Sequence, residues 1–498
     1  MINKLISVFS GSNKVSISPR PYINHSVEFK KSNTPEERMK TLEKVGLNVF
    51  FFPSEMITGC DFLSDSGTTT MTNEQWAALH LGDEAYGSNR GYFRLREQIL
   101  KTFGNDFFNP PEKGKPNAFL FHQGRACENA LFSIIGQMGT NLIIPSNGHF
   151  DTTQANIEAN HITPINLFSL EFKNGDEKFR FKGNMDILAL KKLIKEKYNS
   201  IPILYLTITN NTGGGQPVSL ANIREVSEIA HHAKIPLFFD ACRFAENAWF
   251  IRKYEKGYSQ KSIRAIVLEM FSYIDGFTIS FKKDGLVNMG GGLFIKNTGL
   301  FTKKYPHLID AIMNFQIRTE GHPSYGGLSG RDIMTLTVGL KTVMTDEYLN
   351  YRINQVITFG EEMKNAGLPV QMPIGGHAVY LNVNKFYAGT KMRGEDFGGI
   401  SLTALLLGLY GHRACELGYF AFGKYNPNTR KEIHPEVNFV RFAVPRLRYE
   451  RQDLSAAIVA VKALHDKRDK IPPVKVVYGR DLPLRHFKAR FQFLPKFH

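Results

Sequence analysis

The sequence predicts an α/β protein in which helices flank a mostly parallel sheet, with a smaller α+β lobe completing the chain. Between residues 117 and 295, short apolar runs alternate with segments whose apolar residues recur at helical spacing. The apolar runs are continuous, which is typical of parallel strands buried on both faces. From about residue 335 the pattern changes to helices, short strands and long polar loops. We therefore expect a large domain over residues 69–335 and a small domain made of residues 31–68 and 336–498.

The expected elements follow one another as strand, turn and helix. The strand "NAFLF" (117–121) leads directly into "HQGRACENALFSIIGQMG" (122–139), whose apolar spacing is helical. Further strands are expected within 141–147, 201–209, 234–242, 274–285 and 290–296, and further helices within 185–198 and 220–233. In an open parallel sheet, ligands bind outside the carboxyl ends of the strands. The polar residues at those strand ends are therefore the candidates for a functional site.

Composition sets the general class of the protein. The 498 residues are 42% hydrophobic and 22% charged, as in an ordinary globular protein. We find no run of about 18 apolar residues, so we expect no membrane span. The four cysteines are too few and too scattered for a disulfide framework or a C-x-x-C metal site. These features favour a cytoplasmic protein.

The net charge of +16 raises the question of nucleic-acid binding. Residues 1–31 hold five basic residues against one acidic residue, and residues 467–498 hold nine against two, so the two ends carry +11 of the total. The body of the chain is only mildly basic, and it contains no zinc-finger or RNP motif. We therefore expect no nucleic-acid partner, and interpret the ends as solvated tails or weak polyanion contacts. Residues 1–30 lack a signal-peptide pattern and are expected to form a disordered leader.

The turn "HQGRA" (122–126) is the first candidate site. Gly124 permits a tight turn, and the helix that follows presents free N–H groups and a positive dipole end. Arg125 adds a bidentate donor that suits a phosphate. An ordinary strand-to-helix turn with a surface arginine is the alternative.

The segment "FFDACRF" (238–244) is the second candidate. Asp240 ends an apolar strand, where an unpaired carboxylate is costly, so it should meet a cation such as a protonated pyridine nitrogen. Arg243 could reach a neighbouring ring oxygen or a substrate. An aspartate N-cap at the start of the next helix is the alternative.

Two adjacent lysines in "SFKKDG" (280–285) form the third candidate. Lysine forms Schiff bases with aldehyde cofactors, so one amine could face a cofactor while its neighbour and Ser280 face a phosphate. Solvated loop lysines are the alternative. Together with the phosphate turn, the strand-end aspartate and the glycine-rich turn "TNNTGGGQP" (209–217), the order of these segments predicts a pyridoxal 5′-phosphate (PLP) site.

Several of these segments resemble one enzyme family. The blocks "LSDSGT", "GDEAY", "HQGR", "FDTT", "FFDACRFAENAWF", "SFKKDGLVN", "PSYGGLSGRD", "FAVPR" and "LRHFKARF" occur in one order over roughly residues 30–495. They are similar to the aromatic amino-acid β-eliminating lyases, the tryptophanases and tyrosine phenol-lyases, which are fold-type I PLP enzymes. The resemblance implies a homotetramer that acts on a small-molecule amino acid and needs K⁺ or NH₄⁺.

The resemblance also implies roles for individual residues. Lys283 would hold the cofactor as a Schiff base and remove the α-proton, and Tyr86 would protonate the leaving aromatic carbon. The other residues that the resemblance implies for the cofactor are Gln123, Gly124, Arg125, Phe150, Asp240, Arg243, Ser280 and Lys282. Those implied for the substrate are Ser64, Ser66, Asn211, Tyr325 and Arg441, with Arg441 on the α-carboxylate. Those implied for the monovalent cation are Gly67, Glu84 and Asn288.

Three positions distinguish indole from phenol as the leaving group. Leu417, in "ACELG", stands where tyrosine phenol-lyases carry an arginine for the phenol oxygen. A leucine cannot supply that donor, and a missing polar partner is strongly discriminated. Asp151 and His486 match the tryptophanase type and are expected to be catalytic. The sequence therefore predicts release of indole, pyruvate and ammonia from L-tryptophan.

Other features leave alternatives open. His322 and Gly213 depart from the family pattern close to substrate positions, and the equivalence of Phe50 to a substrate-contacting aromatic is open because its neighbourhood is one residue longer. The same site could act on tyrosine, another aromatic amino acid, or S- or O-substituted cysteine or serine. A non-catalytic PLP-fold protein that binds polyanions through its basic ends is a further alternative.

Overall fold

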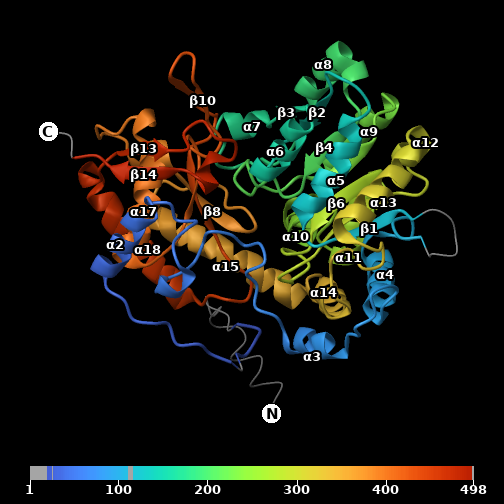
Figure 1. Cartoon of the computed structure of the whole chain (residues 1–498), viewed down its shortest axis with the longest axis horizontal. Coiled ribbons are helices and arrows are strands. Elements are labelled where there is room, and N and C mark those ends of the chain that lie inside the picture. The colour runs from blue at the N-terminus through green and yellow to red at the C-terminus, as the bar shows by residue number, and fades with distance from the viewer. Residues whose placement is uncertain (1–19, 25, 110–115, 496–498) are drawn as a thin grey trace, which may run out of the picture.

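A computed structural model describes residues 20–24, 26–109 and 116–495. Figure 1 shows two lobes, one containing β1, β4 and β6 and the other containing β8, β13 and β14. The long helix α15 (Asp346–Asn365) runs between them. Its first half packs into the core of the large lobe through Leu349 and Ile353, and its second half packs into the core of the small lobe through Phe359 and Met363.

The large lobe is built on a five-stranded sheet in the order β1-β7-β6-β5-β4. Its strands are β1 (Ala118–Phe121), β4 (Leu204–Thr207), β5 (Leu237–Asp240), β6 (Gly276–Ser280) and β7 (Gly291–Ile295). β4, β5 and β6 are mutually parallel, and β7 runs antiparallel to both β6 and β1. β7 is reversed because only a short loop joins it to β6, too short for a crossover to a parallel strand. The predicted mostly parallel sheet is confirmed, and β2 (Ile143–Ser146) and β3 (Thr163–Asn166) form a further parallel pair.

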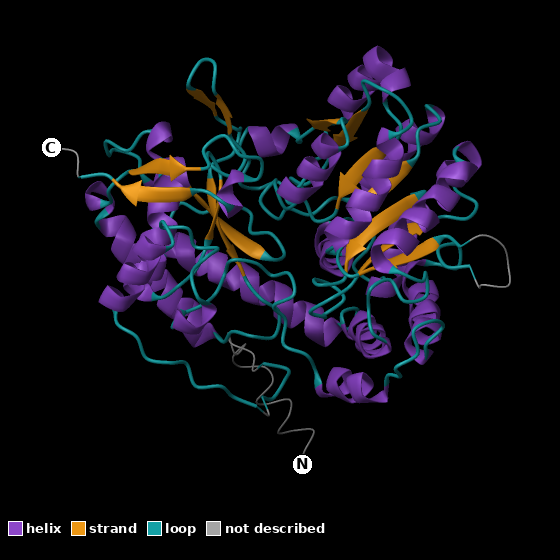
Figure 2. Ribbon diagram, in the orientation of Figure 1, coloured by secondary structure: helices purple, strands orange, loops and turns teal. Residues whose placement is uncertain are grey.

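Helices cover both faces of this sheet (Figure 2). In the large lobe they are α3 (Asn73–Leu81), α4 (Arg90–Phe103), α5 (Gly124–Gly136), α6 (Asp151–Ala159), α7 (Leu170–Lys173), α8 (Ile187–Lys197), η2 (Tyr198–Ser200), α9 (Leu220–His232), α10 (Phe244–Tyr254), α11 (Ile263–Ser272), α12 (Leu300–Lys304), α13 (Pro306–Glu320) and α14 (Gly330–Thr342). Successive strand residues point to opposite faces, so Phe238 and Phe239 of β5 join different core clusters.

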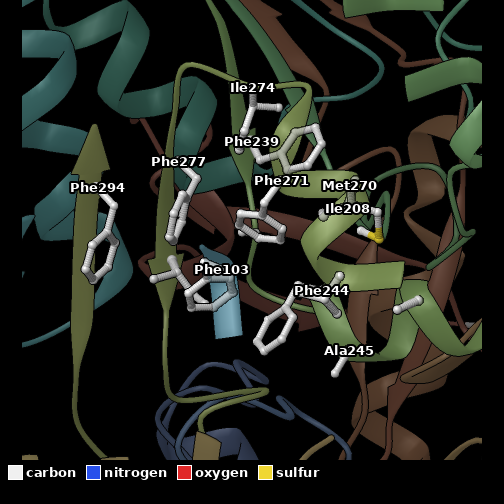
Figure 3. Packing of buried hydrophobic residues seen from close by; sticks show 14 of the residues in the cluster. Phe103, Ile208, Phe239, Phe244, Ala245, Met270, Phe271, Ile274, Phe277 and Phe294 are labelled. Atoms are coloured by element: carbon white, nitrogen blue, oxygen red, sulfur yellow. The ribbon is translucent and has the colours of Figure 1, made fainter. Parts of the chain in front are cut away.

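Aromatic side chains dominate the core on one face of the sheet. Phe103 of α4, Phe271 of α11 and Phe277 of β6 point toward one another in Figure 3. The ring centroid of Phe277 lies 4.9 Å from those of Phe103 and Phe271 and 4.8 Å from that of Phe294. These distances fall in the favourable range for aromatic pairs, so the packing holds β6 firmly against α4 and α11.

The small lobe contains a three-stranded antiparallel sheet in the order β8-β12-β9. Its strands are β8 (Ala378–Asn382), β9 (Cys415–Leu417) and β12 (Phe439–Ala443), with two further pairs, β10 (Lys424–Asn426) with β11 (Lys431–Ile433) and β13 (Val474–Tyr478) with β14 (Arg490–Phe493). Its helices are α2 (Pro35–Lys44), α16 (Val383–Phe386), α17 (Gly398–Tyr410) and α18 (Arg451–Asp466), with short 3₁₀ turns η1 (Ser54–Met56), η3 (Gly394–Asp396), η4 (Arg468–Lys470) and η5 (Arg485–Phe487).

The N-terminal segment packs on the small lobe. A capping box of Thr34 and Glu37 starts α2, and Leu42 of this helix joins a cluster with Ala404 and Leu407 of α17. Most of the predicted leader, residues 1–19 and 25, lies outside the described residues. Within the described ranges, we find no helix that is long and apolar enough to cross a membrane.

Candidate active site

A cavity of about 210 Å³ lies where the carboxyl ends of the large-lobe strands face the small lobe. Its wall is made of the ends of β5 and β6, the starts of α5 and α6, and residues of β9 and β12. The predicted residues that line it are Ser64, Ser66, Gln123, Gly124, Arg125, Phe150, Asp151, Asn211, Asp240, Arg243, Ser280, Lys282, Lys283, Arg441 and His486. The chain therefore brings most of the predicted site together from segments up to about four hundred residues apart.

The start of α5 forms a tight cradle in the cavity wall. Gln123 is the N-cap residue, and no side chain caps this helix end. A Cβ atom added to Gly124 would lie 2.6 Å from Cβ of Ser280, so only glycine fits there. Uncapped N–H groups at a helix start, with Arg125 beside them, form a suitable site for a phosphate.

The ends of β5 and β6 place an acid and two lysines in the same cavity. Asp240 is the last residue of β5, and its Oδ1 accepts a hydrogen bond from the Cys242 N–H at 3.2 Å. The alternative of a helix N-cap does not hold, because α10 begins only at Phe244 with Arg243 as its N-cap residue. Burial lowers the pKa of Lys282, and the positive charge of Lys283 lowers it further.

Glu128 is a cavity residue that the sequence analysis missed. It lies one helical turn after Gly124, and its Oε1 accepts a hydrogen bond from Thr153 Oγ1 at 2.6 Å. Burial and the neighbouring charge of Asp240 raise the pKa of this carboxyl. Glu128 therefore places a second buried carboxyl group near Asp240 in the cavity wall. The i,i+4 spacing from Gly124 was the signal that could have identified it.

Arg441 and Asn211 form a polar group on the small-lobe side. Nη1 of Arg441 donates to Asn211 Oδ1 at 3.3 Å, and Nη2 donates to the Leu63 carbonyl at 2.9 Å. Its buried Nε has no hydrogen-bond partner among the described residues. Asn211 Oδ1 also accepts from the Tyr380 hydroxyl at 2.6 Å. A buried guanidinium with an unused donor is suited to bind a carboxylate.

Asp151 and His486 form a buried pair in the cavity wall. Nε2 of His486 lies 3.0 Å from Asp151 Oδ2, and both side chains are nearly inaccessible. Burial alone would raise the pKa of Asp151, but the hydrogen bond and charge of His486 lower it. Leu417 and Phe487 complete this part of the wall. The Asp151–His486 pair thus adds an ionisable pair to a cavity wall that also contains these two apolar side chains.

Asp65 is a second residue that the sequence analysis missed. Its carboxylate accepts hydrogen bonds from Nε and Nη2 of Arg243 at 3.1 and 2.8 Å, and from Nη1 of Arg446 at 3.0 Å. All three side chains are buried. Burial opposes ionisation of Asp65, yet the charge of Arg243 holds its pKa well below the usual range. Nothing in "LSDSGT" signalled this pairing, because its partners lie about 180 and 380 positions away.

Replacing Asp65 by asparagine is expected to lower the free energy of unfolding by about 3–5 kcal/mol, because the buried Arg243 guanidinium loses its carboxylate partner and Arg446 keeps only Glu246 and Asp284 among the described carboxylates. The measurement is chemical denaturation at neutral pH. The pKa of Asp65 in the folded protein lies below the unfolded value of 3.8. Its contribution to the free energy of unfolding is therefore complete above pH 3.8 and declines as the pH falls below that value. Glu55→Gln, which breaks an exposed pair with Lys31, is the control and should cost less than about 1 kcal/mol. Equal losses would contradict this account.

Some predicted residues do not reach the cavity within one chain. Tyr86 is 61% exposed, and its ring lies 5.0 Å from that of Tyr325 rather than among the cavity residues. The expectation that these tyrosines share a cavity with Lys283 is therefore not met inside a single chain. The reason is that the loop after α3 carries Tyr86 to the outer surface, where its hydroxyl accepts a hydrogen bond from the His322 N–H at 3.3 Å.

Two of the three predicted cation ligands lie together, and the third lies apart from them. The Gly67 carbonyl accepts a hydrogen bond from Asn288 Nδ2 at 2.9 Å, so these two residues lie together. Glu84 lies elsewhere and pairs with Arg331. Among the described residues, no group of three or more His, Cys, Asp or Glu could hold a metal ion.

The cavity fits PLP on several independent grounds. The start of α5 offers a phosphate cradle that only glycine permits, Asp240 offers a carboxylate for a ring nitrogen, and Lys283 offers an amine for the aldehyde. Phe150 offers an aromatic face, and the guanidinium of Arg441 lies 6.0 Å from its ring centroid. Acid, amine and phosphate site thus occur in one enclosed space.

Comparison with known proteins agrees with this geometry. A family model described as beta-eliminating lyase matches residues 61–460. A probable beta-eliminating lyase of Trichomonas vaginalis is 39% identical over 93% of this chain and 96% of its own length. A tryptophanase of Rhodobacter capsulatus and a tyrosine phenol-lyase of Clostridium tetani are each 37% identical over 95% of this chain, covering 99% and 98% of their own lengths.

Solved structures show the same fold at low sequence identity. A serine palmitoyltransferase from S. paucimobilis with a bound PLP adduct has a TM-score of 0.55 at 12% identity, covering 88% of this chain and 97% of that one. A threonine aldolase of Leishmania major has a TM-score of 0.51 at 13% identity, covering 82% and 99%. These two likenesses show the fold. The chain therefore belongs to the beta-eliminating lyase family and is a PLP-dependent carbon–carbon lyase.

Proposed function

We propose that this lyase converts L-tryptophan to indole, pyruvate and ammonia. The observation that carries the proposal is that the buried Asp151–His486 pair and Leu417 line the same cavity. An indole ring needs an apolar pocket with one polar partner, and a phenol hydroxyl needs a further strong donor. Leu417 cannot donate a hydrogen bond.

Arg441 and Asn211 orient the substrate in this proposal. The α-carboxylate binds to the Arg441 guanidinium, whose buried Nε lacks another partner. This contact directs the α-carbon toward Lys283, which lines the same cavity. Because Arg441 is buried, this ion pair is stronger than it would be in bulk solvent.

Lys283 is the proposed general base for the α-proton. PLP, when bound, supplies an electron sink for the charge that develops on the α-carbon. Gln123, Gly124 and Arg125, with Ser280 and Lys282, would hold its phosphate, Asp240 would hold its ring nitrogen, and Lys283 would hold its aldehyde carbon. Nζ of Lys283 would also accept the α-proton as a general base. Ser64 and Ser66 line the substrate side of the same cavity.

The ring carbon must be protonated before it can leave, and Tyr86 is the proposed acid. Tyr86 lies outside the cavity of its own chain, so we propose that a second copy supplies it, together with Tyr325. Exposed apolar side chains support an interface on this side of the large lobe. They are Trp76, Leu81, Phe93, Met289 and Ile317. We propose a homotetramer in which Glu84 of one copy meets Gly67 and Asn288 of another around K⁺ or NH₄⁺, since all three offer oxygen ligands.

We also propose the cytoplasm as the compartment of this enzyme. Cys60, Cys127, Cys242 and Cys415 are all free, as expected in a reducing environment. One observation favours a broader substrate range as the second candidate: His322 lies beside the proposed acid, with ring centroids 6.4 Å apart. Tyrosine, another aromatic amino acid, or S- or O-substituted cysteine or serine would then also be used.

A substrate panel tests the proposal. Purified protein with PLP and KCl is incubated with L-tryptophan, L-tyrosine and an S-alkyl cysteine, and indole, phenol and pyruvate are quantified. We expect kcat/KM for L-tryptophan to exceed that for L-tyrosine by at least about 100-fold, because the site lacks a donor for the phenol oxygen. Phenol release that matches or exceeds indole release would reject L-tryptophan as the substrate.

A further inference from the structure

His486 lies between two buried carboxyl groups, of which Asp151 is only one. Its Nε2 faces Asp151 at 3.0 Å, and its Nδ1 has no hydrogen-bond partner among the described residues although the side chain is only 4% exposed. A buried ring nitrogen without a partner is unfavourable, because its desolvation is not compensated. The lack of a hydrogen-bond partner for Nδ1 of His486 therefore needs a structural explanation.

Glu416 is a buried carboxyl group that lines a small cavity together with His486. It lies in β9 between Cys415 and Leu417, which both line the active-site cavity. Successive strand residues point to opposite faces, so Glu416 projects behind the cavity wall. There it borders a separate small cavity of about 10 Å³, which His486 also lines. His486 thus separates the active-site cavity from the space in front of Glu416.

The carboxyl of Glu416 is fixed in place. Its two oxygens accept hydrogen bonds from the N–H groups of Phe420 at 3.1 Å and Ala421 at 2.9 Å. The start of α17 lies against it, since a Cβ atom added to Gly399 would lie 2.8 Å from Cγ of Glu416. Burial raises the pKa of Glu416, whereas those two N–H groups and the charges of His486 and Arg485 lower it. Glu416 and His486 therefore lie close enough to interact, and both line the small cavity.

The small cavity, at about 10 Å³, is at the lower limit of size for one water molecule. A cavity of about 10–15 Å³ is the minimum for a single water, and the water needs two to four polar partners. Here Nδ1 of His486 and the Glu416 carboxyl are available, and Asn48 and Thr403 line the same space.

We propose that Glu416 is a positioning residue for His486 and that one water in the small cavity joins its carboxylate to Nδ1. The chain Asp151–His486–water–Glu416 then places an acceptor on each side of the imidazole and fixes its orientation toward the departing ring. This inference rests on the proposed function, in which the Asp151–His486 pair faces that ring.

The first test is a high-resolution crystal structure of the PLP-loaded enzyme without substrate. We expect an ordered water within hydrogen-bond distance of both His486 Nδ1 and a Glu416 oxygen. A dry cavity, or a water that contacts neither group, would overturn the inference. This readout does not depend on which amino acid is the substrate, so it also decides the case if L-tryptophan gives no indole or if a variant does not fold.

The second test is a double-mutant cycle of Glu416→Gln and His486→Gln, measured as kcat/KM for L-tryptophan. We expect Glu416→Gln to lower this value on the order of tenfold in the parent enzyme, as loss of an outer partner typically does. In the His486→Gln background it should have little further effect. Elimination from an S-alkyl cysteine, whose thiolate leaves without help from His486, should be unchanged. Equal losses on both substrates, or additive effects in the cycle, would show a merely structural role and reject the proposal.

Discussion

Replacing Lys283 by alanine is expected to remove the visible absorbance of the lysine-bound cofactor and to lower kcat/KM at least about 1,000-fold. The large effect follows because one amine has two tasks, holding the cofactor aldehyde and accepting the α-proton. Lys283 lines the cavity three residues after β6 ends at Ser280. Absorbance spectra and steady-state rates provide the measurement.

The adjacent lysine provides the matched comparison. Lys282 has its Cε close to Gly67, and its backbone carbonyl accepts a hydrogen bond from the Gly67 N–H at 2.8 Å. Lys282→Met is expected to keep the absorbance band and to weaken cofactor affinity by about tenfold, since it removes one phosphate-side cation. If Lys282→Met lost the band and Lys283→Ala kept it, the assignment of the two lysines would be reversed.

Replacing Arg441 by methionine is expected to lower kcat/KM about 100-fold, mainly through a higher KM. The side chain is buried, and its Nε is unpaired, so the substrate carboxylate is the expected partner. A charge-assisted contact of this kind is worth about 1.5–3 kcal/mol, and methionine keeps most of the packing volume. The measurement is steady-state kinetics with L-tryptophan.

Arg413→Met is the control for this variant. Arg413 is also buried in the small lobe, but it binds Asp61 in a bidentate pair, with Nη2 to Oδ2 at 2.6 Å, and does not line the active-site cavity. The control should lower stability and leave KM unchanged. An unchanged KM in Arg441→Met would contradict the carboxylate-binding role.

Local patterns predicted that several residues at strand ends would lie together. Asp240 ends β5, Gly124 and Lys283 each stand three residues after the ends of β1 and β6, and all three line the cavity. Only the resemblance to a known family indicated which of the two lysines holds the cofactor. The fold class followed from the same pattern, because buried parallel strands have continuous apolar sequences. The reversal of β7 was not predicted, because strand direction depends on the connection and not on the strand's own residues.

Contacts between distant segments could not be predicted from local patterns. The Asp65–Arg243 pair joins residues 178 positions apart, and the Asp151–His486 pair joins residues 335 positions apart. Neither has a signature in its own segment, and only the resemblance to a known family indicated His486. Tyr86 differs from these pairs. The resemblance implied a catalytic role for it, but within its own chain its side chain lies exposed on the surface.

Trapping the cofactor on its lysine tests the central claim most directly. The PLP-loaded protein is reduced with borohydride, digested, and analysed by mass spectrometry for the pyridoxyl-modified peptide. The account predicts a single modified site at Lys283, the second lysine of the pair, and none after Lys283→Ala. Modification of Lys282, or of a lysine outside the cavity between the two lobes, would contradict it.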